Sequence, residues 1–270
     1  MRALPLLVLL GATLGCGVAA AGGGAPGATV APDKPEQIHV NAIRDPEVRN
    51  YAAIVAGIDA FEHDRHMAPR VDVLLFRVER RRAAEGGPAP LARLAGDDGF
   101  MLPLALDAAG DIAMPRSQPA LDARSELTLD QKRRDYRVEP RVRTPGLPDN
   151  VRRLGDLRLE CKVRVAIAKK EIGLMWTLAI NSLLLTSDWC DFMKDKEAGF
   201  SFSTPLAITG AVLQEGNRSR NVPFSKNRYT VQLYDSSWSD DALVELTFGE
   251  PDAAPPALTG TAGETPRTGS

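Results

Sequence analysis

The chain has 270 residues, of which 44% are hydrophobic and 25% charged, so it can bury one large core or two small ones and is not disordered throughout. Lys and Arg number 33 against 35 Asp and Glu, and this balance excludes a protein that binds nucleic acid through its overall charge. Three cysteines exclude a disulfide-dense miniprotein, and three histidines leave little material for a metal centre. We therefore expect a globular protein without a cofactor and without a nucleic-acid partner.

The N-terminus has the composition of an export signal. Met1 and Arg2 form a short positive segment, and the apolar run from Ala3 to Leu14 follows directly. Twelve apolar residues are too few to span a membrane but match the core of a signal peptide. We therefore expect an exported protein.

Two processing sites compete at the end of this run. The segment ATLGC, which ends at Cys16, resembles the lipobox of bacterial lipoproteins. The resemblance implies that Cys16 receives a diacylglyceryl group and becomes the new N-terminus, and that Gly17 directs the protein to the outer membrane. The alternative is Val18-Ala19-Ala20, a small-x-small site for ordinary signal peptidase that would give a soluble periplasmic protein.

Composition divides the rest of the chain into three parts. Residues 17–36 form a Gly/Ala/Pro-rich flexible tether, residues 37–250 a β-rich globular domain, and residues 251–270 a disordered tail. The signal peptide covers residues 1–16, or extends to about 20 without lipidation. The globular part has the length of one large domain or of two sub-domains with a break near 140–150.

Hydrophobic periodicity predicts a helix early in the globular part and two strands after it. Residues 45–66 place apolar side chains three or four apart, with Asp45 as the N-cap and Pro46 in the first turn. Residues 70–80 are apolar on both sides, which is typical of a central strand. Pro103 restricts the strand in residues 97–107 to a sheet edge.

Later segments point mainly to strands. Residues 157–168 alternate apolar and charged side chains and predict a strand. The apolar run 172–185 fits either periodicity, and we favour a buried helix. Segments 205–217, 227–235 and 242–248 return to strand patterns. The fold class expected is mainly β (α+β), a two-sheet β-sandwich-like domain with one or two packed helices.

Export changes the role of the cysteines. With Cys16 lipidated or removed, Cys161 and Cys190 remain as a pair in an oxidising compartment, which indicates a structural disulfide. A buried free pair is the alternative. A redox couple is disfavoured, because the spacing lacks the Cys-x-x-Cys arrangement.

The search for catalytic groups yields one weak cluster. His63 and His66 lie three residues apart near the end of the first helix, and Glu62 or a returning His39 are further candidate metal ligands. The order of a His-Glu-x-x-His zinc site is absent, and so are a Gly-x-Ser-x-Gly elbow and a phosphate-binding loop. A solvated helix end is therefore favoured over a metal site.

Charge is distributed unevenly along the chain. Residues 132–170 contain 13 basic and 5 acidic side chains, whereas residues 229–252 contain six acids and no Lys or Arg. The two segments face each other, or the basic one binds anionic partners of the cell envelope. The candidates for such a surface are Arg133, Arg134, Arg152, Arg153, Arg158, Lys162 and Arg164.

These observations favour a non-catalytic module of the cell envelope over an enzyme. Its expected partner is an envelope protein, an anionic lipid or a wall polymer, and its expected contact with the membrane is a lipid anchor rather than a transmembrane helix. The alternative is a secreted metal-dependent hydrolase that uses His63 and His66.

Overall fold

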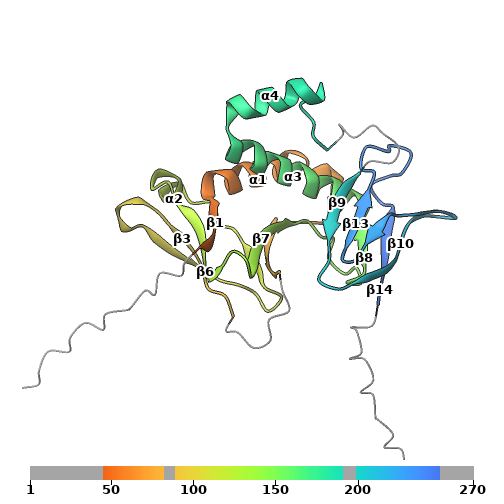
Figure 1. Cartoon of the computed structure of the whole chain (residues 1–270), viewed down its shortest axis with the longest axis horizontal. Helices are drawn as coiled ribbons and strands as arrows, with labels where there is room; N and C mark the ends of the chain where they lie inside the picture. The colour runs from red at the N-terminus through yellow and green to blue at the C-terminus, as the bar shows by residue number, and fades with distance from the viewer. Residues whose placement is uncertain (1–44, 82–88, 191–198, 250–270) are drawn as a thin grey trace, which may run out of the picture. The chain divides into compact units, whose positions relative to one another are not determined.

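The computed structural model describes residues 45–81, 89–190 and 199–249 (Figure 1). All of them belong to one compact unit, Ala42–Ser270. The predicted signal peptide, Cys16, the tether, His39 and the C-terminal tail lie outside the described residues.

The fold class is confirmed as mainly β with a few helices. The described strands form four short sheets in which every paired strand is antiparallel. Two sheets come from the first half of the chain, with the orders β1-β6-β3-β4 and β5-β2-β7. Two come largely from the second half, with the orders β11-β10-β14-β8 and β12-β13-β9.

The strands of the first two sheets are β1 (Pro46–Asn50), β2 (Leu75–Arg80), β3 (Ala92–Ala95), β4 (Met101–Leu104), β5 (Asp111–Ala113), β6 (Glu126–Lys132) and β7 (Tyr136–Arg141). Those of the other two are β8 (Val151–Arg153), β9 (Phe200–Ser203), β10 (Ile208–Glu215), β11 (Arg218–Asn221), β12 (Phe224–Ser225), β13 (Arg228–Val231) and β14 (Leu243–Phe248). The prediction of a central strand is confirmed by β2, and that of an edge strand containing Pro103 by β4. The three C-terminal strand predictions are also confirmed.

Helices in the described residues are α1 (Tyr51–His63), α2 (Gln118–Asp122), α3 (Leu154–Ile172) and α4 (Leu174–Leu184), with short 3₁₀ turns at Arg65–Met67 and Asp97–Gly99. The predicted first helix exists but begins later than expected. Asn50 rather than Asp45 is its N-cap, and the Asn50 side chain accepts a hydrogen bond from Ala53 N at 3.2 Å. Pro46 instead starts β1, because that segment pairs with β6.

The prediction of a strand at residues 157–168 is wrong, because the segment lies inside the 19-residue helix α3. Its alternating apolar side chains combine two helical series offset by two positions. One series contains Leu157 and Cys161, and the other contains Leu159, Val163 and Ile167, each with a spacing of four. Because both series are buried, the helix mimics the alternation of a strand.

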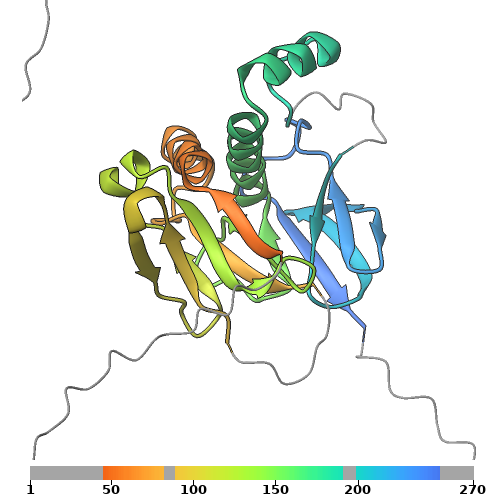
Figure 2. The same ribbon diagram turned by 60° about the vertical axis from the view of Figure 1, so that its left-hand side comes forward.

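The two series of α3 belong to two different hydrophobic clusters. Leu159, Val163 and Ile167 pack with α1 and the first two sheets. Leu157 and Cys161 pack with the strands of the second half. Figure 2 shows α3 between these two groups of strands, with α1 beside it. The predicted break near 140–150 precedes α3, but this helix contributes to both cores.

Helices α1 and α3 approach closely at a glycine. A Cβ atom on Gly57 would lie 2.7 Å from Ile167 Cγ1 and 3.3 Å from Val163 Cγ1, both shorter than normal van der Waals contacts. Gly57 therefore allows the two helices to touch. The close contact fixes the position of α3 against the first core.

We expect Gly57→Val to lower the free energy of unfolding by about 1–3 kcal/mol, because the added methyl groups overpack this contact. Urea denaturation followed by circular dichroism measures the change. The control is Ala56→Val, which adds similar bulk to the next, half-buried position of the same helix. Equal stability of the two variants would contradict the close-packing argument.

Candidate functional site

The most unusual surface of the described chain is helix α4. It follows α3 after Gly173, whose φ of 81° ends the preceding helix, and it stops at Leu185 in the left-handed conformation. Four residues later the chain reaches Trp189 and then Cys190. Figures 1 and 2 both show α4 on the side of α3 away from the sheets.

A disulfide closes the segment that contains α4. Cys161 on α3 is bonded to Cys190, with the two Cα atoms 6.0 Å apart, which confirms the predicted pair. Both cysteines are buried in the second hydrophobic cluster. The bridge therefore fixes the end of the α4 segment to the middle of α3.

Polar contacts hold the loop between α4 and the bridge. Lys162 forms an ion pair with Asp188, and Lys169 Nζ lies 5.1 Å from the centre of the Trp189 ring. Trp189 Nε1 donates a hydrogen bond to Asn181 Oδ1 at 2.8 Å. Burial lowers the pKa of Lys169, although Asp188 partly opposes this shift. Together these contacts link the inner side of α4 to α3 through the loop that contains Asp188 and Trp189.

The inner face of α4 carries Thr177 and Asn181, two of the three polar side chains of the helix. Thr177 Oγ1 donates to the carbonyl oxygen of Gly173 at 2.9 Å, and Asn181 accepts the bond from Trp189. Ile180 and Leu184 lie on the same face and are half-buried. The polar pair Thr177 and Asn181 therefore lies on the half-buried side of the helix.

The outer face of α4 is almost entirely apolar. Exposed fractions reach 78% for Met175, 69% for Trp176 and 81% for Leu183. The helical positions exposed on this face are Leu174, Met175, Trp176, Leu178, Ala179, Ser182 and Leu183. Ser182, the one polar member, donates its hydroxyl to the carbonyl oxygen of Leu178 at 3.0 Å. Leu185, just after the helix, is also exposed.

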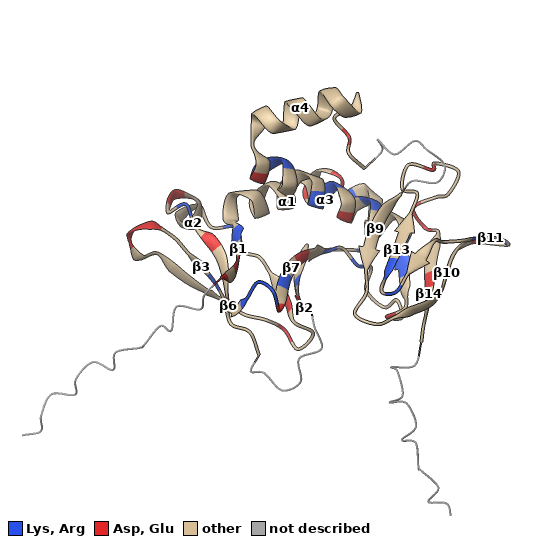
Figure 3. Cartoon of the chain, viewed as in Figure 1, with Lys and Arg blue, Asp and Glu red and all other residues tan. Residues whose placement is uncertain are grey.

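No residue of α4 is charged, and the helix is uncoloured throughout in Figure 3. The prediction of a helix at residues 172–185 is confirmed, but the prediction that it is buried is wrong. The sequence shows that this segment is apolar and uncharged. It does not show whether other parts of the protein cover the helix. Within the described residues, no helix combines the length and the apolarity needed to cross a membrane.

The predicted basic surface is distributed differently from the expectation, because its central part is helical. Arg158 bonds to Asp240 at 2.6 Å and to three backbone carbonyl oxygens, while Arg153 bonds to Asp241 at 2.9 Å. The acidic segment after residue 229 therefore does face the basic one. Arg153, Arg158 and Lys162 are thus engaged inside the protein and form no strand stripe.

The other candidate basic residues lie at separate places. Arg133 and Arg134 are exposed near the turn between β6 and β7, where Arg134 lies 3.5 Å from Asp135. Arg152 and Arg164 both bind the buried carboxylate of Glu160, each at 2.8 Å. The structure thus brings together only Arg152 and Arg164 around one shared group.

The candidate metal ligands near the end of α1 do not converge. Glu62 Oε2 accepts a hydrogen bond from Arg116 at 2.8 Å, and Arg116 also binds Asp59 at 2.7 Å. His63 is the last residue of α1, whereas His66 lies in the following 3₁₀ turn. In the portion of the chain that the structure describes, no three His, Cys, Asp or Glu side chains are grouped to hold a metal ion.

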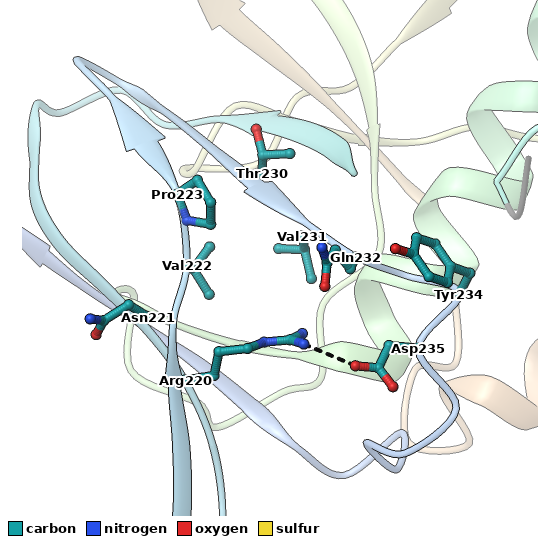
Figure 4. A pocket seen from close by; sticks show the side chains of 9 residues that line it. All are labelled: Arg220, Asn221, Val222, Pro223, Thr230, Val231, Gln232, Tyr234 and Asp235. Carbon is teal, nitrogen blue, oxygen red and sulfur yellow. Dashed lines mark hydrogen bonds and ion pairs between the residues drawn. The ribbon is translucent and has the colours of Figure 1, made fainter. Parts of the chain in front are cut away.

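A cavity of about 770 Å³ lies beside β11 and β13 (Figure 4). Its walls include Val222, Pro223 and Val231, and its main charged feature is the ion pair between Arg220 and Asp235 at 2.9 Å. Hydrogen bonding by Ser237 and Arg220 lowers the pKa of Asp235. The nine described lining residues include no histidine, cysteine or lysine, and the carboxylate of Asp235 is bonded to Arg220.

Comparison with known proteins adds no functional assignment. No family model, curated protein or solved structure matches this chain. Among the surfaces described above, the outer face of α4 departs furthest from an ordinary water-exposed surface.

We expect the double variant Cys161→Ser, Cys190→Ser to lower the free energy of unfolding by about 3–4 kcal/mol, because the bridge closes a loop with a sequence separation of 29. Urea denaturation measures the loss. Peptide mapping of the untreated protein without reductant should recover the linked peptides. Two freely alkylated thiols in the native protein would refute the bridge.

Proposed function

We propose that this protein is an exported, non-catalytic module of the cell envelope that docks on a lipid surface through the outer face of α4. The observation that carries the proposal is the polarity of this helix, because Thr177 and Asn181 lie on the inner face while the outer face is apolar except for Ser182. A helix exposed to water normally has the opposite arrangement. An apolar environment outside the protein would explain this one.

The breadth of the apolar face favours lipid over a single protein partner. At about 100° per residue, the exposed positions from Leu174 to Trp176 cover an arc of about 200°. A helix that packs on one protein surface needs a stripe of roughly 100°. A lipid phase can surround the wider arc without specific contacts.

The chemistry of the face supports the same choice. Protein interfaces have roughly one hydrogen bond per 100–200 Å² of contact, but the outer face offers only Ser182, which is bonded within its own helix. Trp176 is of the residue type enriched at membrane surfaces. Lys170, exposed at the end of α3, can meet an anionic headgroup.

The length of α4 supports docking in the interface rather than insertion across it. Its 11 residues extend about 16 Å, roughly half the thickness of a hydrocarbon core. Six large apolar side chains, each half withdrawn from water, contribute roughly 5–9 kcal/mol. The helix is preformed and held by the disulfide, so little of this energy is lost to ordering.

We expect the purified protein to bind vesicles, and Met175→Ser with Leu183→Ser to weaken binding roughly 30- to 100-fold, because two apolar side chains no longer enter the lipid. Sedimentation with vesicles of phosphatidylethanolamine and phosphatidylglycerol measures the affinity. The matched control is Met101→Ser with Leu91→Ser, which removes two similarly exposed side chains elsewhere. A blue shift of tryptophan fluorescence that disappears in Trp176→Phe would report contact at α4.

Salt and oligomeric state separate this proposal from its competitors. Docking by an uncharged face persists at 1 M salt, whereas binding through the basic residues of 132–170 falls steeply. Equal vesicle binding by the α4 variant and its control would refute lipid docking. A dimer in size-exclusion chromatography that dissociates in the α4 variant would assign the face to a second copy of the chain instead.

The lipid anchor is the second part of the proposal and depends on the sequence alone. We expect Cys16→Ser to release the protein from membranes or to halt its processing, because the acylated thiol is lost. Intact mass spectrometry of membrane-extracted protein measures the modification. A mature N-terminus at Ala20 or beyond would exclude the anchor, while α4 docking would remain testable on the unlipidated protein.

A further inference from the structure

A second cavity, of about 440 Å³, lies among β2, β7, β8, α3 and β9. Its lining is unusual in the number of guanidinium groups that it contains. The arginines that line it are Arg77, Arg141, Arg143, Arg152 and Arg164. Four of them belong to the basic segment 132–170, and the fold adds Arg77 from β2.

Two buried carboxylates are each shared by two of these arginines. Asp111, which is 4% exposed, accepts hydrogen bonds at 2.7 Å from both Arg77 and Arg141. Burial raises the pKa of Asp111, although Arg77 opposes the shift. Each shared arrangement of this kind has one positive charge more than it has negative charges.

Glu160 forms the second shared arrangement. Its carboxylate is 3% exposed, accepts bonds from Arg152 and Arg164, and also receives the backbone N–H of Val142 at 3.1 Å. The Nε–H groups of Arg152 and Arg164 are buried and have no hydrogen-bond partner among the residues that the structure describes. The protein therefore does not use all the donors of these two side chains.

Within the described residues, Arg143 forms no ion pair with a buried carboxylate, although the buried Asp156 acts on its charge from a longer distance. Its guanidinium donates to the carbonyl oxygens of Val151 and Leu147, at 3.1 Å and 3.0 Å. Its nearest carboxylate, Asp149, lies 3.7 Å away and is itself in solvent. Burial lowers the pKa of Arg143, and the positive charge of Arg152 adds to the shift.

The charges around the cavity do not balance. Glu79, which also lines the cavity, is neutralised by Arg137 from the neighbouring strand. The lining itself contains five arginines and three carboxylates, Glu79, Asp149 and Glu160, a difference of two positive charges. The buried Asp156, outside the lining, also acts on Arg143 and Arg152. An excess of arginine over carboxylate in a partly buried cluster is unfavourable for stability, because unpaired buried charge is costly.

The remaining wall combines apolar side chains with the hydroxyl groups of Ser203, Thr204 and Tyr229. Phe202, Leu246 and Phe248 line the cavity, and Arg164 lies over the Phe202 ring at 5.6 Å from its centre. Guanidinium groups match phosphate oxygens in geometry, and aromatic walls accept an apolar substituent. The cavity thus combines an excess of positive charge with a surface for an apolar group.

We propose that this arginine-lined cavity binds a small phosphomonoester that carries an aromatic or other apolar group. The dianionic phosphate neutralises the excess charge of Arg143 and the Glu160 arrangement, while the apolar part contacts Phe248 and the exposed Leu206. This site is separate from the outer face of α4 and is independent of lipid docking.

The experiment is calorimetric titration of the purified mature protein with phenyl phosphate, inorganic phosphate and benzyl alcohol. Phenyl phosphate should bind with a Kd of roughly 1 mM or below, inorganic phosphate more weakly, and the neutral alcohol not at all. Arg143→Gln should weaken binding of phenyl phosphate at least tenfold. Arg133→Gln, at an exposed arginine outside the cavity lining, is the matched control and should bind as the unaltered protein does.

A measurement on the unaltered protein keeps the proposal testable if Arg143→Gln fails to fold. Spectra of the protein labelled with ¹⁵N-arginine should show phenyl phosphate shifting the Nε signals of Arg152 and Arg164. Absence of binding at about 10 mM, shifts confined to exposed arginines, or equal affinity of folded Arg143→Gln would overturn the proposal.

Discussion

The burial of two faces of α3 is the constraint on which the rest of the structure depends. Leu159 and Val163 complete the core of the first half, and Leu157 and Cys161 complete that of the second. Four short sheets would each hide little apolar surface alone, so the helix supplies a common wall. The charged side chains between the two faces lie at the boundary of the two cores, where Glu160 binds Arg152 of β8 and Arg158 binds Asp240 in the turn before β14.

This double burial also explains what the sequence could and could not predict. Strands such as β10 and β14 follow ordinary alternation, and Pro103 marked an edge correctly. Alternation in α3 indicated a strand because two helical series, four residues apart within each, were superimposed. Hydrophobic periodicity indicates which side chains are buried. When a helix is buried on two sides, this periodicity no longer distinguishes a helix from a strand.

The candidate sites were less predictable than the fold, for a related reason. The apolar run around Trp176 was evident in the sequence, but its exposure depends on where α3 ends and on the bridge at Cys190. The polar pair Thr177 and Asn181, four residues apart, was the one available sign that the helix turns its polar side inward. For the arginine cavity, Arg152 and Arg164 were among the candidates, whereas Arg77, Arg141 and Arg143 join them only through tertiary structure.

The closed loop between Cys161 and Cys190 has a consequence for how this protein can diversify. The part of the loop formed by α4 contributes no side chain to either hydrophobic cluster, while the bridge and α3 keep its two ends in place. Substitutions on the outer face of α4 therefore leave both cores intact, whereas Thr177 and Asn181 are needed for the contacts of its inner face. The surface that α4 presents to its surroundings can thus vary in sequence without any change in the packed scaffold beneath it.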